Sequence, residues 1–191
     1  MRATVLWTGG KDSALAFHKA RLAGYEIVNL LTFVPEKADF LAHPLPFIKY
    51  QAEAIGMPHH EVVIEAPVEG GYEKAIRAFK DKHKIDAFIT GDIAEVNGLP
   101  NWIRERCRNS GVDVLTPLWG ANRREVFMEL LSSGFKVIIS CVKTGCLDEE
   151  WLGRELDKKA LSELIAIGNK TGLDICGEQG EYHTLALDGP I

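Results

Sequence analysis

Six residues near the amino end, Thr8 to Ser13, combine two glycines, a lysine, a carboxylate and two hydroxyls. They follow an apolar segment and open a segment with helical periodicity. Adjacent glycines let a backbone approach a ligand closely, and the N-terminus of a helix offers unpaired N–H groups and partial positive charge. Together with the charge of Lys11, these features suit a phosphate group. The alternative is an ordinary turn in which Asp12 and Ser13 only favour the start of a helix.

A second glycine and carboxylate, Gly91 and Asp92, follow the apolar run Ala87–Thr90. A phosphate would repel the Asp92 carboxylate unless the carboxylate also bound a cation or a hydrogen-bond donor. The chemistry of a carboxylate suggests Mg²⁺, a ribose hydroxyl or an incoming amine. An aspartate that only caps the next turn would give the same pattern.

The third cluster lies between Cys176 and Pro190, where 15 residues contain three carboxylates, one histidine and three glycines. Apolar residues recur from Tyr182 to Leu187, so we expect this segment to dock or to add a strand. It would then present Glu178, Glu181 and His183 on a glycine-containing loop. Such side chains suit a cationic substrate, ammonium, or removal of a proton from an attacking nitrogen. A solvated acidic loop fits the spacing equally well.

The elements that must position these clusters alternate between β-rich and helical segments. The predicted strands are Ala3–Trp7, Ile27–Phe33, His60–Ile64, Ala87–Thr90 and Val112–Leu115, and the predicted helices are Asp12–Ala23, Leu45–Ile55, Tyr72–Lys82, Trp102–Asn109 and Arg123–Ser132. Connections too long for hairpins predict a mostly parallel sheet that is covered on both faces. Ligands of such sheets bind at the carboxyl ends of the strands, near the point where strand order reverses.

The pattern changes from about Phe135, and we place a soft domain boundary near residue 120, because Pro117–Gly120 ends the fifth repeat. The following region is predicted to be α+β, with a strand over Lys136–Cys141, a charged helix around Arg154–Asn169 and a glycine-rich tail. No linker rich in Pro, Gly or Ser separates the two regions.

The composition limits the classes of function. The 191 residues include 22 Lys and Arg against 27 Asp and Glu, and this net charge of −5 disfavours broad nucleic-acid binding. The longest apolar runs are far shorter than the roughly 20 residues of a spanning helix, so we expect no membrane segment and no signal peptide. The four cysteines lack the spacing of a zinc or redox site and the density of a secreted disulfide scaffold, which favours the cytoplasm.

The segment Thr8–Ser13 matches neither the P-loop pattern nor the dinucleotide-binding fingerprint. It resembles the SGGKDS signature of the PP-loop ATP pyrophosphatases, with Thr8 in place of the usual serine. That resemblance implies cleavage of ATP between its α- and β-phosphates, with the pyrophosphate held by this loop. It also implies a Rossmann-like open parallel five-stranded sheet of the HUP, or adenine nucleotide alpha hydrolase-like, class, with a smaller C-terminal α+β region.

Over nearly the whole chain, the sequence resembles the diphthine-ammonia ligase family. Six motifs of that family occur here in order: Thr8–Ser13, Gly91–Ile93, Pro117–Gly120, Trp151–Arg154, Gly177–Thr184 and Asp188–Pro190. The family adenylates a carboxylate with ATP, releases pyrophosphate and replaces AMP by ammonia. The resemblance therefore implies a carbon-nitrogen ligase of diphthamide biosynthesis that uses ATP and Mg²⁺. Its further partners would be ammonia or ammonium and diphthine on an elongation factor.

The motif positions imply a role for each residue. Residues 1–120 would form the PP-loop ATP-binding domain, and residues 121–191 the region for the acceptor substrate. The residues implied to bind ATP are Thr8, Gly9, Gly10, Lys11, Asp12, Ser13 and Gly91, with Asp12 also a ligand of Mg²⁺. The implied catalytic residues are Lys11, Asp92, Glu178 and Glu181. The residues implied to contact the acceptor or ammonia are Glu178, Gly180, Glu181, His183 and Thr184.

Two segments depart from the pattern of the diphthine-specific members. Ala94–Arg104 replaces their usual Ser-x-Tyr-Gln-Arg, and His183 stands before Thr184 where they typically have Glu. Both departures resemble a prokaryotic subgroup associated with cobalamin salvage. Amidation of a corrinoid carboxylate by the same chemistry is therefore the alternative reaction.

Two further functions share parts of this pattern. Transfer RNA thiolation by PP-loop proteins would need a catalytic cysteine pair and a basic RNA-binding module, whereas Cys141 and Cys146 stand five apart in an acidic chain. A non-catalytic ATP-binding sensor of the universal stress protein kind shares the sheet topology but not Lys11, Asp12 and the acidic tail. The sequence leaves the oligomeric state open, with a homodimer among the alternatives.

Overall fold

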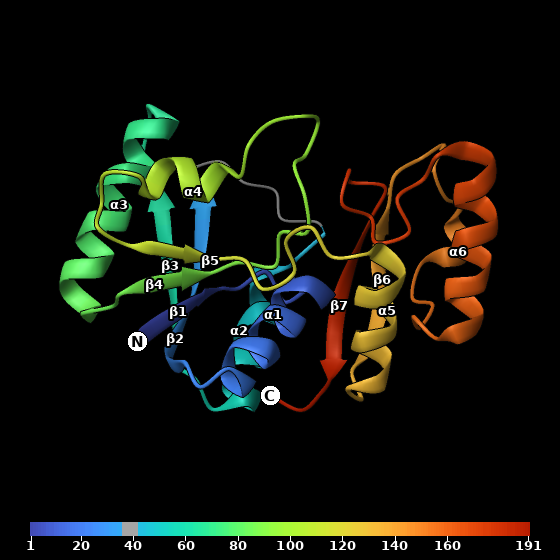
Figure 1. Cartoon of the computed structure of the whole chain (residues 1–191), viewed down its shortest axis with the longest axis horizontal. Helices are drawn as coiled ribbons and strands as arrows, with labels where there is room; N and C mark the ends of the chain where they lie inside the picture. Colours follow the sequence, from blue (N-terminus) through green and yellow to red (C-terminus); the bar gives the residue numbers. More distant parts are fainter. Residues whose placement is uncertain (36–41) are drawn as a thin grey trace.

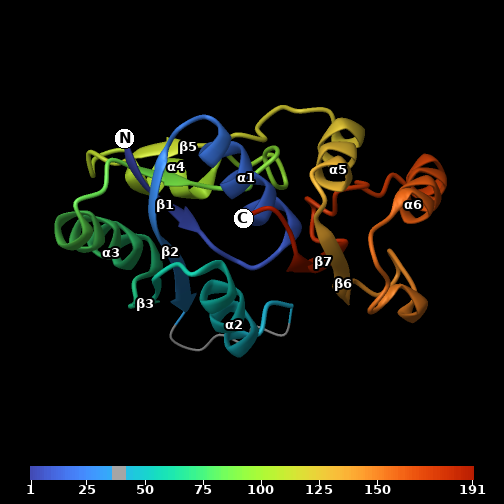
Figure 2. The ribbon, with the colours of Figure 1, turned by 90° about the horizontal axis from the view of Figure 1, so that it is seen from below.

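The structure is a computed structural model that describes residues 1–35 and 42–191. The elements in chain order are β1 (Arg2–Leu6), α1 (Lys11–Leu22), β2 (Glu26–Pro35), α2 (Leu45–Ile55), β3 (His59–Ile64), α3 (Val68–His83), β4 (Ala87–Ile89), α4 (Trp102–Cys107), β5 (Asp113–Leu115), α5 (Arg123–Ser132), β6 (Lys136–Val142), the 3₁₀ helix η1 (Glu149–Trp151), α6 (Lys158–Thr171) and β7 (Tyr182–Asp188). Strands β1–β5 with α1–α4 lie at one end of the molecule, and β6, β7, α5 and α6 lie at the other (Figure 1, Figure 2).

The larger sheet is parallel and has the strand order β3-β2-β1-β4-β5. The chain adds β2 and β3 on one side of β1, then returns to add β4 and β5 on the other, so the order reverses between β1 and β4. The register pairs Ala3 of β1 with Ile27 of β2 and with Ala87 of β4. Because β1 and β4 run in the same direction, the segments Thr8–Ser13 and Thr90–Asp92 emerge at one edge. The predicted open, parallel five-stranded α/β sheet is confirmed, and its first and fourth strands are neighbours.

Two hydrophobic cores cover the two faces of this sheet. Phe17 of α1 and Ile48 of α2 pack in the first core, and Phe79 of α3 packs in the second. The adjacent β4 residues Phe88 and Ile89 belong to different cores, as the alternation of side chains along a strand requires. The sheet is therefore buried on both faces, as predicted.

The tail forms a strand that pairs with the region after residue 120. Strands β6 and β7 are antiparallel, with Val137 opposite Ala186 and Val142 opposite Tyr182. Tyr182 also belongs to the core that contains helix α1, so one core runs through both ends of the molecule. The expectation that the tail adds a strand is confirmed, whereas the domain division near residue 120 stays a prediction.

Two helices begin at positions that the periodicity did not indicate. Helix α3 begins at Val68, whereas the predicted helix began at Tyr72. The sequence pattern does not reveal the first turn because Gly70 and Gly71 are poor helix formers. Helix α6 begins later than predicted, directly after Asp157. The Asp157 carboxylate accepts a hydrogen bond from the Ala160 N–H at 2.6 Å and caps the helix.

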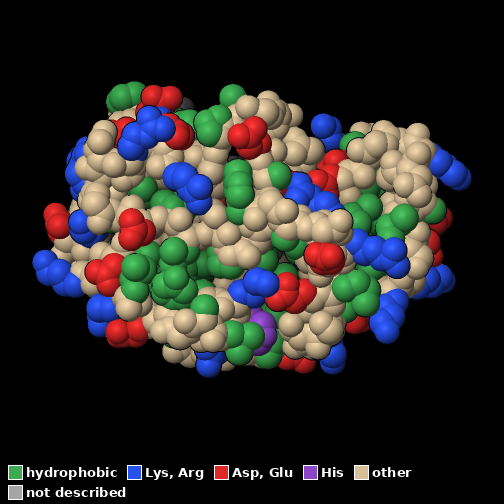
Figure 3. All heavy atoms as spheres, viewed as in Figure 1, with side chains coloured by type: hydrophobic (Ala, Val, Ile, Leu, Met, Phe, Trp, Pro, Cys, Tyr) green, Lys and Arg blue, Asp and Glu red, His purple; other side chains and the backbone are tan. Residues whose placement is uncertain are grey.

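The surface carries charges of both signs. On the face seen in Figure 3, basic and acidic side chains are intermixed and do not form one basic field. In the part of the chain that the structure describes, no helix has the length and apolar character needed to cross a membrane.

Gly91 allows helix α1 to pack directly against the end of β4. A Cβ atom at this position would lie 2.6 Å from the Ser13 amide nitrogen and 2.7 Å from the Asp12 carbonyl oxygen. Both atoms are backbone of the first helical turn, so they cannot move aside as the end of a flexible side chain can. The missing side chain therefore determines how closely the two predicted ligand-binding segments approach each other.

We expect Gly91→Ala to lower the free energy of unfolding by about 1–3 kcal/mol, because the added methyl group overpacks this contact. Urea denaturation of both proteins measures the change. Gly70→Ala is the control, since its Cβ would meet no atom closer than 3.8 Å. That variant should be neutral or slightly more stable, and equal stability of the two variants would contradict the close packing.

Candidate active site

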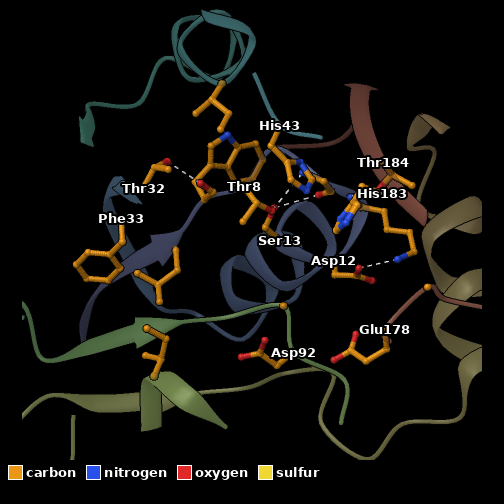
Figure 4. Close-up of a pocket in the computed structure, with 18 of the residues that line it drawn as sticks. Thr8, Asp12, Ser13, Thr32, Phe33, His43, Asp92, Glu178, His183 and Thr184 are labelled. Carbon is orange, nitrogen blue, oxygen red and sulfur yellow. Dashed lines mark hydrogen bonds and ion pairs between the residues drawn. The ribbon is translucent and has the colours of Figure 1, made fainter. Parts of the chain in front are cut away.

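A cavity of about 440 Å³ opens at the edge of the sheet where the strand order reverses. Its walls come from the ends of β1 and β2, the first turn of α1, the segment after β4, and the tail around β7 (Figure 4). Leu31, Phe33 and Ile103 line the cavity from one packed apolar cluster, and the Tyr72 ring lies 5.0 Å from the Phe33 ring between centroids; we call this part the apolar half. In Figure 4, Asp12, His43, Glu178 and His183 lie away from Phe33, and we call the part of the cavity that they line the polar half.

The segment Thr8–Ser13 forms a turn between β1 and α1, as predicted. Gly9 has a φ of +74°, in the left-handed region that favours glycine. Ser13 Oγ donates a hydrogen bond to the Gly10 carbonyl at 3.0 Å, and Thr8 Oγ1 donates to Ser13 Oγ at 3.2 Å. Thr8 and the residues from Gly10 to Ser13 line the cavity, whereas Gly9 shapes the turn from outside it.

The tail supplies the cap of helix α1. Gly10, the residue before this helix, has no side chain to cap it, and the Lys11 N–H instead donates to Thr184 Oγ1 of β7 at 3.0 Å. The Ala186 N–H donates to the Gly9 carbonyl at 2.9 Å. Gln51 of α2 links the two segments, because its Nε2 donates to the Gly9 carbonyl at 2.9 Å and to the Ala186 carbonyl at 2.7 Å. The predicted residue Thr184 therefore positions the loop, and Gln51 supports it from a third element.

Lys11 is buried beneath the polar half of the cavity. Its ammonium forms an ion pair with Asp12 Oδ2 at 2.6 Å and donates to the Cys176 carbonyl of the tail. Burial alone would lower the pKa of Lys11, but Asp12, Cys176 and Glu178 together outweigh that effect and the pKa is raised. The ammonium is therefore charged, and much of its charge is already matched by Asp12.

Asp92 lines the cavity opposite helix α1. Its Oδ2 accepts hydrogen bonds from Thr90 Oγ1 at 2.6 Å and from Asn101 Nδ2 at 2.5 Å. Asn101 also caps α4 by accepting from the Arg104 N–H at 2.8 Å. Asn101 is not among the predicted site residues, although an asparagine directly before a helix is a recognisable cap signal.

Glu178 fastens the tail to the segment after β4. Its Oε1 accepts from the Ile93 N–H at 2.9 Å and from the Ala94 N–H at 3.3 Å. Burial raises the pKa of the Glu178 carboxyl, and the hydrogen bond from Ile93 opposes that rise. Figure 4 shows the carboxylates of Glu178 and Asp92 on the same side of the cavity. With Lys11, three of the four predicted catalytic residues therefore line this cavity.

Glu181 lies outside the cavity. Its side chain is buried, with Oε1 accepting from the Asp174 N–H at 2.9 Å and Oε2 accepting from the Gln179 N–H at 3.0 Å. Gly180 lines the cavity, but Glu181 does not. In this structure, the carboxylate predicted to contact the acceptor instead holds the turn of the tail.

Two histidines meet at the polar half of the cavity. The rings of His43 and His183 pack edge to face, with centroids 5.2 Å apart. Burial, His183 and Lys11 lower the pKa of His43 to about 4, and burial and then Lys11 lower the pKa of His183. Both rings are therefore neutral at pH 7. His183 was predicted from its motif, whereas His43 carries no motif signal of its own.

Mg²⁺ fits this site only as a partner of phosphate. Among the described residues, no group of three or more His, Cys, Asp or Glu side chains is arranged to hold a metal ion. Asp12 Oδ1 is enclosed and has no hydrogen-bond partner there, so it could serve as one oxygen ligand. Mg²⁺ commonly takes one or two carboxylates and completes its shell with phosphate oxygens and water. Asp12 is therefore a suitable residue to hold the ion once a nucleotide is present.

Two profiles of one protein family match the chain. The diphthamide synthase N-terminal domain matches residues 1–114, and the diphthamide synthase C-terminal domain matches residues 123–191. The chain belongs to the diphthamide synthase family. Proteins named diphthine–ammonia ligase from Bos taurus and Homo sapiens are each 28% identical to it, over 100% of this chain and 80% of the relative. A protein of that name from Schizosaccharomyces pombe is 26% identical, and this chain covers 35% of it.

A solved structure has the same fold as this member of the diphthamide synthase family. It is described as a predicted subunit of tRNA methyltransferase from Methanocaldococcus jannaschii, and it aligns with a TM-score of 0.51 at 17% identity. The alignment covers 100% of this chain and 98% of the other. The predicted diphthine-ammonia ligase family and the predicted α/β fold are therefore both confirmed.

We expect Glu181→Gln to lower the free energy of unfolding by about 1–3 kcal/mol, because an amide NH₂ cannot accept the backbone hydrogen bond that it would face. Thermal or urea unfolding measures this loss. Glu53→Gln on the exposed side of α2 is the matched control and should leave stability unchanged. If Glu181→Gln removed activity with no loss of stability, the carboxylate would instead act on a substrate.

The depressed pKa of His43 predicts a pH-dependent stability. Between its ordinary pKa near 6.5 and its folded pKa of about 4, the unfolded chain binds the extra proton. Burial of His43 therefore lowers the free energy of unfolding as the pH falls from about 6.5 to about 4, by on the order of 2–3 kcal/mol in total. Unfolding free energies of wild type and His43→Gln, measured from pH 7 to pH 4, should diverge to the disadvantage of wild type. Parallel curves would contradict the burial of this ring.

Proposed function

We propose that this protein is an ATP-dependent carbon–nitrogen ligase that activates a substrate carboxylate as an adenylate and converts it to an amide with ammonia. Membership of the family supports an ATP-dependent amidation, since the relatives carry the name diphthine–ammonia ligase. The observation that carries the mechanism is the meeting of Thr8–Ser13, Asp92 and Glu178 at one cavity.

The chemistry requires activation because a carboxylate does not react with ammonia unaided. Its negative charge repels nucleophiles, and its leaving group would be oxide. In the proposed first step, a carboxylate oxygen attacks the α-phosphorus of ATP, the bond to the β-phosphate breaks, and pyrophosphate leaves. In the second step, the nitrogen of ammonia attacks the acyl carbon, the bond to AMP breaks, and the nitrogen gives up a proton.

The two halves of the cavity suit the two ends of ATP. The apolar half, lined by Phe33, Tyr72 and Ile103, offers a place for the adenine base. The first turn of α1, from Lys11 to Ser13, lines the polar half, where the backbone N–H groups and the helix dipole favour negative charge. Negative charge grows on the departing pyrophosphate, so a loop that binds this group stabilises the transition state more than the ground state.

Asp92 and Glu178 are the groups that could receive ammonia. Asp92 Oδ2 is held by Thr90 and Asn101, which fixes the direction of the carboxylate toward the cavity. A carboxylate held in this way can bind ammonium or accept the proton that the attacking nitrogen releases. Glu178 lies beside it with a raised pKa, so its charge is easier to neutralise. Mg²⁺ held by Asp12 would supply positive charge to the phosphate oxygens.

The acceptor proposed first is diphthine on an elongation factor, because the relatives are named for it. A corrinoid carboxylate is the second candidate, and a specific observation favours it. Val96 and His183, from the two segments that depart from the diphthine-specific pattern, both line the cavity. Both departures therefore line the cavity in which the acceptor and the nucleotide would meet.

We expect Lys11→Ala to reduce pyrophosphate release from ATP by more than about a hundredfold, because both the loop and the tail lose their shared cation. The assay incubates purified protein with ATP, Mg²⁺, ammonium and an acceptor, and separates AMP, ADP and pyrophosphate. Lys19→Ala is the control on the same helix, since its ammonium pairs with Glu129 away from the cavity. Formation of ADP by the wild type would contradict the proposed adenylation.

The same assay distinguishes the acceptors. Elongation factor bearing diphthine and a carboxylated corrinoid are supplied separately, and amide formation is followed by mass spectrometry together with AMP. The true acceptor should raise AMP formation and gain an amide in equal amounts. AMP formation with neither acceptor amidated would leave the adenylation intact and exclude both acceptors.

A further inference from the structure

The polar half of the cavity has a shortage of positive charge. Three of the side chains that line the cavity, Asp12, Asp92 and Glu178, are carboxylates. Among the described residues that line the cavity, Lys11 is the only Lys or Arg. Lys11 is also paired with Asp12 at 2.6 Å and bound to the tail. A nucleotide triphosphate carries several negative charges, so other groups must interact with its terminal phosphates.

His43 and His183 lie where their rings can interact with the terminal phosphates. The His43 ring stands against the glycine turn, where a Cβ on Gly10 would lie 3.3 Å from His43 Cε1. The His183 ring packs on it from β7, one residue before Thr184, which caps helix α1. Figure 4 shows both rings beside the first turn of α1, on the side opposite Asp92 and Glu178. The pair and the carboxylates thus occupy different walls of the cavity.

The hydrogen-bonding state of His43 also points to a ligand. His43 Nδ1 is enclosed and has no hydrogen-bond partner among the residues that the structure describes. A buried polar atom without a partner is costly, so most such groups in proteins are satisfied by protein, water or a ligand. A neutral imidazole carries one N–H, which either nitrogen can hold. The ring can therefore offer a donor to the cavity without a change of charge.

We propose that His43 and His183 form the second half of the pyrophosphate site and donate hydrogen bonds to the terminal phosphates of ATP. This inference rests on the proposed function, because it assumes that the phosphates lie at the first turn of α1. The helix turn contacts the pyrophosphate from one side and the two imidazoles contact it from the other. AMP, which lacks these phosphates, does not reach the histidine pair.

Binding of pyrophosphate, ATP and AMP, each measured by titration calorimetry in the presence of Mg²⁺, tests the proposal. We expect His43→Ala and His183→Ala each to weaken binding of pyrophosphate and ATP by about tenfold or more, the loss typical of a hydrogen bond to a charged group. Binding of AMP should stay within about twofold of wild type. His43→Gln, which keeps one N–H donor, should lose less than His43→Ala.

His83→Ala is the matched control, because His83 packs on Phe79 in α3, away from the cavity. It should leave all three affinities unchanged. Equal losses for AMP and pyrophosphate in the His43 variants would mean that the ring only supports the fold, and unchanged pyrophosphate binding would mean that it does not touch the phosphates. Either result overturns the histidine assignment alone. Failure of the wild type to bind ATP or pyrophosphate overturns the proposed function as well.

Discussion

The hydrogen bond from the Lys11 N–H to Thr184 Oγ1 is the contact on which the site depends. A glycine turn can bend close to an anion, but Gly10 has no side chain with which to cap the helix that follows. The cap comes instead from β7, whose Ala186 N–H also binds this turn, and Gln51 of α2 secures the turn from a further element. The loop is therefore shaped by the tail as much as by its own residues.

The same tail brings the acidic side chains to the cavity. Glu178 binds the Ile93 and Ala94 N–H groups after β4, while Glu181 holds the turn of the tail itself. Two carboxylates from one motif thus have different tasks, one at the cavity wall and one behind it. Because Gly91 lets α1 approach β4 closely, the parts contributed by β1, β4 and β7 form a single site.

Much of this arrangement could be predicted from local patterns. The alternation of strands and helices leads to the parallel sheet, and the glycine turn after the first strand leads to the position of the loop. The contributions of Gln51 and His43 could not be predicted, because each depends on contacts made across the fold. Asn101 carries a local cap signal, but nothing in the sequence shows that it also donates to Asp92. Gln51 reaches the Gly9 carbonyl from another helix, and the packing of His43 on His183 requires β7 to be in place. The position of Glu181 was missed for the same reason, since spacing alone does not show which carboxylates face inward.

The distance in sequence between the helix and its cap also affects how the protein is made. Lys11 and Thr184 are 173 positions apart. Contacts of such long range form late, because the entropy of closing the intervening loop must be overcome first. During synthesis on the ribosome, the sheet can assemble while the glycine turn still lacks its cap. A nascent chain would thus acquire the complete nucleotide loop only after its seventh strand has emerged.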